Sequence, residues 1–292
     1  MFSGSMVAVV TPMTDDGGID AAAWRRLVEW HIAEGTDAIV VAGTTGESPT
    51  LSAAEVAGLT EQALEAAADR IPVIVGTGTN STAGTVERTR ALSGLGAAGV
   101  LIVTPYYNRP SQEGLYRHFM AAAEVSQAPV ILYNVPSRTA VDLLPATVAR
   151  LAAHPRIVAV KEAAGQVGRV RDILERSRES FAVIAGEDSI ARQSMLAGAR
   201  GVISVTANVA PRAMREMCAA ATGGDEARAE KIDATLADLH LKLFLEANPI
   251  PVKWALAEMG MIGRGLRLPL TPLAEEHHAP VRMALQRAGA LK

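Results

Sequence analysis

The stretch that decides the fold is Ile157-Val158-Ala159-Val160-Lys161-Glu162. Its first four residues are apolar and mostly β-branched, which is typical of a buried strand. Burial disfavours the charged form of an amine, and a neutral amine can attack a carbonyl carbon to form a Schiff base. The stretch therefore predicts a buried strand that ends on a candidate nucleophile, Lys161. The alternative is a lysine whose stem covers the end of the strand while its head stays in water.

Apolar runs of the same kind recur along the chain, and helical stretches separate them. The expected strands are Met6–Val10, Ala38–Val41, Val73–Val75, Val100–Val103, Val130–Tyr133, Ile157–Val160, Ala182–Ala185 and Gly201–Val205. Strands that alternate with helices in this way predict an α/β fold, a (β/α)8 TIM barrel. A doubly wound nucleotide-binding sheet is the alternative. We reject it because its candidate loop, residues 76–81, lacks the third glycine and the acidic residue of the dinucleotide fingerprint.

Helix boundaries can also be located in the sequence. Ser52 and Glu55 have the spacing of a capping box, so a helix should begin there. Three further residues are placed as N-terminal caps: Asp20, Asn80 and Asp142. Three glycines are placed as C-terminal stops: Gly35, Gly96 and Gly198.

The strand pattern stops after residue 205, and the rest of the chain is helical in character. The expected helices are Pro211–Thr222, Asp225–Ala247, Pro249–Gly260 and Pro280–Ala290. We therefore predict a barrel over residues 1–208 and a C-terminal helical segment over residues 209–292 that packs on it.

Composition excludes several classes of protein. The formal net charge is −3 and no basic stripe is present, which argues against a nucleic-acid partner. No apolar run approaches the length of about 20 residues that a membrane helix needs. The first residues have no charged region or cleavage pattern of a signal peptide, and Cys218 is the only cysteine. We expect a cytoplasmic enzyme, with Cys218 as a packing residue.

The six histidines do not have the spacing of metal ligands, so no metal site is expected.

Polar residues gather at the ends of the expected strands, where TIM barrels carry their chemistry. They are Gly43-Thr44-Thr45-Gly46-Glu47-Ser48, Thr104-Pro105-Tyr106-Tyr107-Asn108, Tyr133-Asn134-Val135-Pro136-Ser137-Arg138-Thr139, Lys161-Glu162 and Gly186-Glu187-Asp188. The glycines of the first stretch would let backbone N–H groups approach an anion. Tyr133 could move a proton beside Lys161, and Arg138 offers a fork for a carboxylate. Taken singly, the glycine-threonine stretch is also compatible with a tight turn, and Arg138 with a surface ion pair.

With these motifs, and with Gly201-Val202-Ile203-Ser204-Val205 and Asn248-Pro249-Ile250-Pro251-Val252-Lys253, the chain resembles a known family over essentially its full length. This is the Schiff-base pyruvate aldolase family of N-acetylneuraminate lyase and dihydrodipicolinate synthase, and the resemblance is strongest to the dihydrodipicolinate synthase branch. It implies condensation of pyruvate with aspartate 4-semialdehyde to 4-hydroxy-tetrahydrodipicolinate, in lysine and diaminopimelate biosynthesis. It also implies that no metal or organic cofactor is needed.

The resemblance assigns the catalytic roles to four residues. It implies that Lys161 forms the Schiff base with pyruvate and that Tyr133 donates and accepts protons beside it. It implies that Thr45 links Tyr133 to Tyr107, which a neighbouring subunit supplies. Members of the family are usually homotetramers built from two tight dimers, so we expect a homotetramer here.

The resemblance also assigns the substrate contacts. It implies that Thr44 helps to hold the pyruvate carboxylate and that Arg138 binds the semialdehyde carboxylate and positions Tyr133. Gly186 and Ile203 match positions that contact substrate. Sialic acid lyases usually lack the arginine because their aldehyde is neutral. The alternatives are a pyruvate-dependent aldolase for another aldehyde, of the keto-deoxy sugar acid or sialic acid type, and a non-catalytic barrel.

Many members are inhibited by lysine at the tight-dimer interface, and the matching pocket is degenerate here. Three of its positions are retained: Ser48, Asn80 and Tyr106. Two histidines of the family are replaced by Ala53 and Val56, and its glutamate by Gly84. The sequence therefore predicts weak inhibition by lysine or none.

Overall fold

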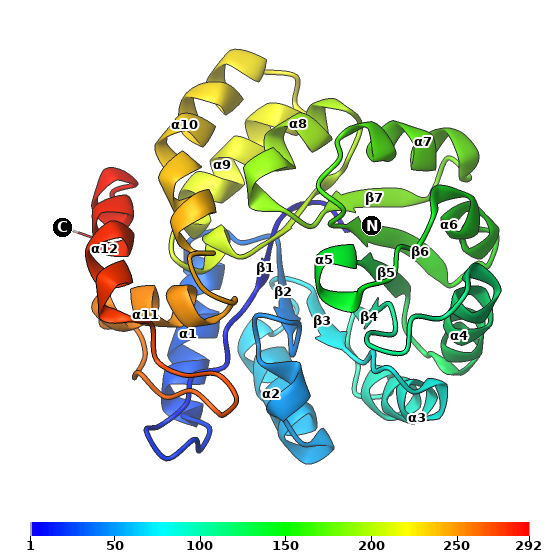
Figure 1. The fold of residues 1–292 in the computed structure, drawn as a ribbon, viewed down its shortest axis with the longest axis horizontal. Coiled ribbons are helices and arrows are strands. Elements are labelled where there is room, and N and C mark those ends of the chain that lie inside the picture. The colour runs from blue at the N-terminus through cyan, green and yellow to red at the C-terminus, as the bar shows by residue number, and fades with distance from the viewer. Residues whose placement is uncertain (1, 292) are drawn as a thin grey trace.

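A closed barrel of eight parallel strands forms the centre of the molecule (Figure 1). The computed structural model describes residues 2–291. Its strands are β1 (Gly4–Ala8), β2 (Ala38–Val41), β3 (Val73–Gly76), β4 (Gly99–Val103), β5 (Val130–Asn134), β6 (Ile157–Glu162), β7 (Ala182–Ala185) and β8 (Gly201–Ser204). Each strand pairs with the next in chain order, and β8 closes the barrel against β1. This confirms the predicted TIM barrel.

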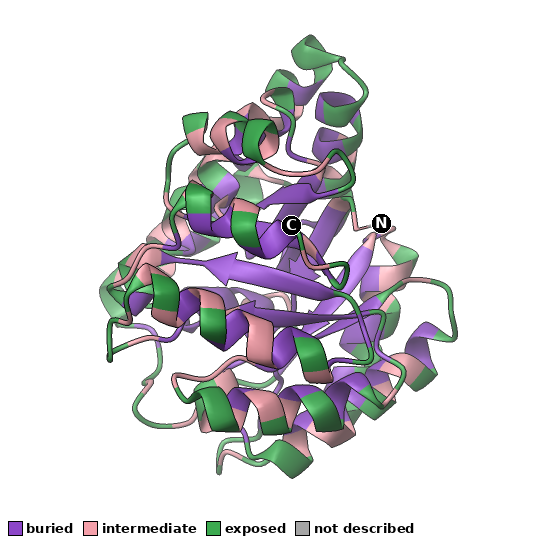
Figure 2. Cartoon of the chain, turned by 90° about the vertical axis from the view of Figure 1, so that its right-hand side faces the viewer, coloured by how far each residue is buried: buried purple, intermediate pink, exposed green. Residues whose placement is uncertain are grey.

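Helices connect successive strands and cover the outside of the barrel. They are α1 (Ala21–Ala33), α2 (Ala53–Ala67), α3 (Thr82–Ser93), α4 (Gln112–Val125), α5 (Pro136–Thr139), α6 (Pro145–Ala152), α7 (Gly168–Arg176), α8 (Ala191–Leu196) and α9 (Pro211–Thr222). Figure 2 shows buried residues on the strands and on the helix faces turned toward them. Alternate strand residues fill the barrel interior, among them Met6, Val40 and Ile131, and the residues between them pack under the helices.

Most predicted boundaries hold, but several are wrong. Strand β1 ends at Ala8 rather than Val10, because the Val10 N–H bonds to the Asn208 side chain instead of extending the ladder. Asn80 does not cap α3: the Ser81 hydroxyl accepts from the Gly84 N–H and takes that role. Asp142 does not cap α6, because α6 begins later, at Pro145.

The other predicted N-terminal caps and the glycine stops are confirmed. Ser52 and Glu55 form the capping box of α2, and Asp20 caps α1. The three glycine stops all have positive φ, which favours a residue without a Cβ atom: Gly35, Gly96 and Gly198.

The C-terminal helices α10 (Glu226–Lys242), α11 (Ile250–Glu258) and α12 (His278–Arg287) lie together on one side of the barrel (Figure 1). Helix α9 packs against β1 and serves as the helix of the eighth strand–helix unit. The predicted division between residues 208 and 209 stays a prediction. Helix α10 ends before the expected Ala247, and the residues that follow it form a loop toward the barrel mouth.

Within residues 2–291, no helix is long and apolar enough to cross a bilayer.

Candidate active site

Lys161 and Tyr133 lie side by side at the carboxyl ends of β6 and β5. The two residues are register partners across the paired strands, and each is 5% exposed. The Lys161 Nζ atom lies 4.2 Å from the centroid of the Tyr133 ring. In the described part of the chain, the Lys161 side chain makes no hydrogen bond and no ion pair. The strand register therefore positions the Lys161 amine, and no described protein group pairs with it.

A polar network directly behind these residues fixes the two strand ends. The Asn134 side-chain amide donates to Glu162 Oε1 at 3.0 Å and to Asp142 Oδ1 at 2.8 Å. Arg169 donates to Asp142 at 2.9 Å and to Glu162 at 3.3 Å. Burial raises the pKa of Glu162, and Arg169 opposes that rise. Because Asn134 follows Tyr133 and Glu162 follows Lys161, the network holds the pair in register.

A cavity of about 720 Å³ opens above Lys161 at this end of the barrel. Six of the predicted site residues line it: Thr44, Thr45, Tyr133, Arg138, Lys161 and Gly186. Three carboxylates also line it: Glu187, Asp188 and Glu246. Burial and the nearby Asp188 raise the pKa of Glu187, while Asp188 accepts from the N–H groups of Val205 and Thr206. The cavity thus presents both signs of charge to a ligand.

Two of the residues predicted to act in catalysis or substrate contact do not line this cavity. Ile203 is 1% exposed and belongs to the side chains that fill the barrel interior. Tyr107 is 88% exposed on the loop after β4, and its φ of 74° is strained for a bulky side chain. In the single chain, Tyr107 therefore projects from the surface instead of joining Tyr133.

The loop between α10 and α11 contacts two predicted site residues. The Asn248 side-chain amide donates to Thr45 Oγ1 at 3.0 Å, and the Asn248 carbonyl accepts from Arg138 at 3.2 Å. Because an amide N–H can only donate, the Thr45 hydroxyl is an acceptor in this contact, and its proton is directed elsewhere. Our sequence reasoning missed Asn248, although it lies in a motif that carried the resemblance.

A buried ion pair anchors this loop to the glycine-threonine stretch. Lys253 Nζ lies 2.5 Å from Glu47 Oε1, and the two residues are 1% and 2% exposed. The Arg267 N–H also donates to Glu47, at 3.4 Å. Glu47 has a φ of 59°, so the turn that carries it is held in a left-handed conformation. The sequence alone gave no signal for this contact because 206 residues separate its partners.

A second cavity, of about 230 Å³, adjoins the first and shares Thr44 and Arg138 with it. Ser48 and Tyr106, which match the lysine pocket of the family, line this cavity. Asn80 does not line it; its carbonyl accepts from the Asn108 side chain at 2.8 Å. Thr44 is therefore the threonine that faces both cavities.

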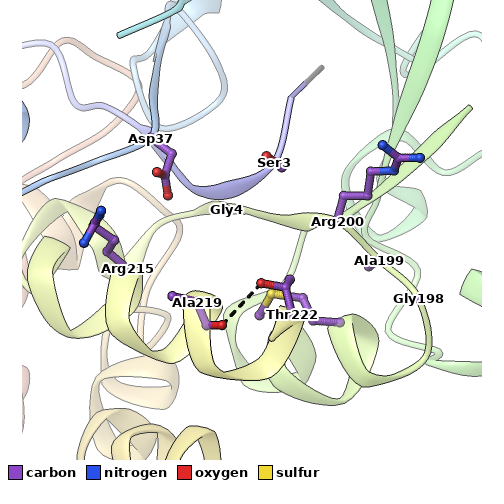
Figure 3. Close-up of a pocket in the computed structure, with 10 residues that line it drawn as sticks. Ser3, Gly4, Asp37, Gly198, Ala199, Arg200, Arg215, Ala219 and Thr222 are labelled. Atoms are coloured by element: carbon purple, nitrogen blue, oxygen red, sulfur yellow. Dashed lines mark hydrogen bonds between the residues drawn. The ribbon is translucent and has the colours of Figure 1, made fainter. Parts of the chain in front are cut away.

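A further cavity, of about 580 Å³, lies at the opposite, amino end of the barrel (Figure 3). Asp37, Arg200 and Arg215 line it, and Asp37 accepts from the Ser5 N–H at 2.7 Å. None of the predicted site residues line it. In the part of the chain that the structure describes, no group of three or more His, Cys, Asp or Glu side chains is arranged to hold a metal ion.

Comparisons with known proteins agree with this geometry. The model of the dihydrodipicolinate synthetase family matches residues 1–288. Proteins named 4-hydroxy-tetrahydrodipicolinate synthase from Azoarcus sp. (strain BH72) and Alkalilimnicola ehrlichii are each 55% identical, and the matches cover 99% and 100% of both chains, respectively. The crystal structure of the chloride-inhibited dihydrodipicolinate synthase from Acinetobacter baumannii, complexed with pyruvate, has a TM-score of 0.98, 52% identity and full coverage of both chains. The chain therefore belongs to the dihydrodipicolinate synthetase family.

Proposed function

We propose that this protein is a lyase that condenses pyruvate with aspartate 4-semialdehyde to give 4-hydroxy-tetrahydrodipicolinate, in lysine and diaminopimelate biosynthesis. The observation that carries the proposal is the pairing of Lys161 with Tyr133 at the base of the cavity. An amine with no protein partner beside a phenol is the arrangement that Schiff-base chemistry needs. The two relatives named 4-hydroxy-tetrahydrodipicolinate synthase support the same reaction.

The first half of the reaction is assigned to Lys161 and Tyr133. The Lys161 amine attacks the carbonyl carbon of pyruvate, and water leaves the carbinolamine as the imine forms. Tyr133 lies beside Lys161 and moves the protons that this dehydration requires. The imine withdraws electrons from the pyruvate methyl group, which then loses a proton and becomes the carbon nucleophile. The lysine itself is the electron sink, so we propose no metal or organic cofactor.

The second half is assigned to Arg138 at the cavity wall. The guanidinium binds the semialdehyde carboxylate, with one of its N–H groups held by the Asn248 carbonyl. A site that pairs with a carboxylate discriminates strongly against an aldehyde without one, because its own charge is then left unpaired. This favours the semialdehyde over a neutral sugar.

The threonine residues and Tyr107 form the proposed proton path to solvent. The resemblance assigns the link between Tyr133 and Tyr107 to Thr45 and the pyruvate carboxylate to Thr44. The Thr45 hydroxyl already accepts a hydrogen bond from Asn248, whereas Thr44 lines both cavities. Thr44 is therefore the alternative residue for linking Tyr133 to Tyr107. The exposed position of Tyr107 supports its insertion into a neighbouring subunit. As the family resemblance implies, we propose a homotetramer, and we propose that it works in the cytoplasm.

Gly186 is the remaining proposed substrate contact, and Ile203, which matches a contact position of the family, is proposed to act from behind the cavity. Gly186 lines the cavity, and a Cβ atom there would lie 2.6 Å from Ala163 Cβ, so a side chain would not fit without a shift. Ile203 supports the base of the cavity from the barrel interior.

Regulation by lysine is proposed to be weak or absent. A glutamate at position 84 would pair with a lysine ammonium, and Gly84 cannot. Losing a hydrogen bond to a charged group costs about 1.5–3 kcal/mol, roughly tenfold to over a hundredfold in affinity. Half-maximal inhibition by lysine below the millimolar range would contradict this. By comparison with the Acinetobacter baumannii relative, we also propose sensitivity to chloride.

Steady-state turnover tests the proposed function. Purified protein is assayed with pyruvate and either aspartate 4-semialdehyde, N-acetylmannosamine or a panel of neutral aldehydes. We expect kcat/KM near or above about 10⁴ M⁻¹s⁻¹ for the semialdehyde alone. In Arg138→Ala, the semialdehyde KM should rise sharply while borohydride trapping of pyruvate persists. Turnover only with a neutral aldehyde would be consistent with the Schiff-base mechanism but would contradict aspartate 4-semialdehyde as the second substrate.

A further inference from the structure

Arg138 is carried by a short loop, residues 135–141, and its side chain makes few contacts that fix its position. The guanidinium lines the cavity of about 720 Å³, and in the described part of the chain its one hydrogen bond goes to the Asn248 carbonyl, at 3.2 Å. The loop contains one helical turn, α5, and then reverses at Ala140. The φ of Ala140 is 57°, which is left-handed and unfavourable for a residue with a Cβ atom. A conformation of this kind persists only where the surrounding structure enforces it.

The two ends of this loop are joined at its base. The Asn134 side chain, at the end of β5, donates to Asp142 Oδ1 at 2.8 Å and accepts from the Leu143 N–H at 2.9 Å. Arg169, on α7, donates to both carboxylate oxygens of Asp142, at 2.9 and 3.0 Å, and to the Leu143 carbonyl at 3.0 Å. We call Asn134, Asp142 and Arg169 the clasp. The chain leaves the clasp at Asn134, passes through Arg138 and returns at Asp142, so the clasp fixes both ends of the loop.

The clasp lies outside the cavity and is largely shielded from water. Asn134 is 0% exposed, and the side chains of Arg169 and Asp142 are 12% and 34% exposed. Bidentate pairing of a guanidinium with a carboxylate fixes direction as well as distance, and partial burial reduces its screening by salt. None of the three side chains lines the cavity, so a substrate bound there does not contact them. An effect of the clasp on the reaction therefore passes through the segments that it holds.

Asp142 is the member of the clasp that acts on the loop alone. Asn134 and Arg169 also donate to Glu162 in β6, at 3.0 and 3.3 Å, so they hold that strand as well. These contacts to Glu162 do not involve the Asp142 carboxylate and remain when it is removed. A change at Asp142 therefore separates the position of the loop from the position of β6.

We propose that Asp142, through the clasp, is a positioning residue for the second substrate: it sets the loop so that the Arg138 guanidinium meets the semialdehyde carboxylate in a bidentate geometry. The proposal rests on the proposed function, which assigns that carboxylate to Arg138. A fork that meets a carboxylate on two N–H groups tolerates little misplacement, and an error of about 1 Å in a positioning group can cost roughly a hundredfold in rate. The pyruvate step, which is assigned to Lys161, does not depend on the loop.

Kinetics of Asp142→Ala test the proposal. KM for the semialdehyde should rise about tenfold, while KM for pyruvate and the extent of borohydride trapping of pyruvate stay within about twofold of wild type. Asp142→Asn keeps an acceptor for Arg169 and Asn134 without the charge, so its KM should lie between those of wild type and Asp142→Ala. Asp172→Ala is the matched control, because Asp172 pairs with Arg176 on the surface of α7 and does not line the cavity.

A double-mutant cycle shows whether the effect passes through Arg138. In an Arg138→Ala background, where the fork is already absent, adding Asp142→Ala should change kcat/KM for the semialdehyde by no more than about twofold. A merely structural role would instead lower the unfolding midpoint and the trapped fraction, and it would lower kcat/KM by the same factor in both backgrounds. Equal losses in both backgrounds, an unchanged semialdehyde KM in Asp142→Ala, or a parallel rise in KM for pyruvate overturns the proposal.

Hydrogen exchange followed by mass spectrometry observes the loop without a substrate. The amide protons of residues 138–140 bond to carbonyls within the loop. They should exchange faster in Asp142→Ala than in wild type or Asp172→Ala, and those of β6 should not. If this pattern is seen in a protein that does not turn over the semialdehyde, the clasp holds the loop and the proposed second substrate is wrong. If turnover is normal and the loop of Asp142→Ala exchanges as in wild type, the clasp proposal is wrong and the proposed function stands.

Discussion

Two of the described lysines are buried near the same end of the barrel, and they differ in what surrounds the amine. Lys253 is 1% exposed, and its Nζ atom contacts the Glu47 carboxylate at 2.5 Å. Lys161 is 5% exposed and lines the cavity, and its Nζ atom lies over the Tyr133 ring without a hydrogen bond or ion pair to any residue in 2–291. Burial alone therefore does not make a lysine a nucleophile. The distinguishing features are an amine without a carboxylate partner and space for a substrate beside it.

The two lysines also belong to different parts of the architecture. Lys161 ends a strand whose register with β5 sets its distance from Tyr133. Lys253 lies on α11 and connects the C-terminal helices to the turn that carries Thr44 and Thr45. Burial lowers the pKa of Lys253, and Glu47 opposes that change. We interpret Lys161 as a reactive group and Lys253 as a structural support for the same site.

Replacing Lys161 gives the largest expected effect on activity. Lys161→Ala should abolish trapping of pyruvate by borohydride and lower turnover by at least about 10⁴-fold, because no other described group supplies the imine. Arg215→Ala, at the amino-end cavity of Figure 3, is the control, and it should change kcat/KM by no more than about twofold. Comparable losses in both variants would contradict the assignment of the site to the carboxyl end.

Replacing Lys253 should instead act on stability. Lys253→Met leaves Glu47 as an unpaired buried carboxylate, which costs about 3–5 kcal/mol of unfolding free energy. Urea unfolding followed by circular dichroism measures the loss. The double variant Glu47→Gln with Lys253→Met should recover part of it, because the uncompensated charge is gone. A Lys253→Met variant as stable as wild type would contradict the structural role of Lys253.

Asn248 lies on the same C-terminal segment as Lys253, but unlike Lys253 it contacts predicted site residues directly. Asn248→Ala removes the donor to Thr45 and keeps the main-chain contact to Arg138. We expect kcat to fall about tenfold, the size of roughly one hydrogen bond, with the unfolding midpoint nearly unchanged. Ser137→Ala, which alters the wall of the same cavity, is the control. Equal kinetics in wild type and Asn248→Ala would show that Thr45 needs no such support.

His31, on α1, is a third buried basic side chain, and it has neither a cavity beside it nor a carboxylate partner among the described residues. Burial lowers its pKa to about 3, so the folded state takes up the proton far less readily than the unfolded state. The unfolding free energy therefore has its full His31 contribution above pH about 6.5. Below that pH the unfolded state binds the proton first, and the unfolding free energy falls by at most about 1.4 kcal/mol per pH unit. Thermal unfolding across this range should show a shallower acid loss in His31→Gln. His118, whose pKa burial lowers to about 4, contributes in the same direction and remains in that variant.

Much of the architecture could be predicted because it depends on local patterns. The run that ends at Lys161 has the composition of a buried strand, and the structure places it in β6. The spacing of the strands along the chain predicts that their carboxyl ends share one face, and six predicted site residues do line one cavity there. The roles assigned to those residues stay predictions.

The rest depends on contacts that no local pattern encodes. The partners in the Thr45–Asn248 and Glu47–Lys253 contacts are 203 and 206 residues apart, and each pairing exists only once the C-terminal helices pack on the barrel. The residue type of Asp142 predicts a helix cap. In the structure its carboxylate binds Arg169 and Asn134, and these stronger partners outweigh a capping role.

Locating the pyruvate adduct tests the central claim most directly. Protein incubated with pyruvate is reduced with borohydride, digested and sequenced by tandem mass spectrometry. We expect the reduced adduct on Lys161 alone, with Lys253 unmodified. An adduct on Lys253 or another lysine, or no adduct in a folded protein that turns over pyruvate, would contradict the distinction between the two buried lysines on which the account depends.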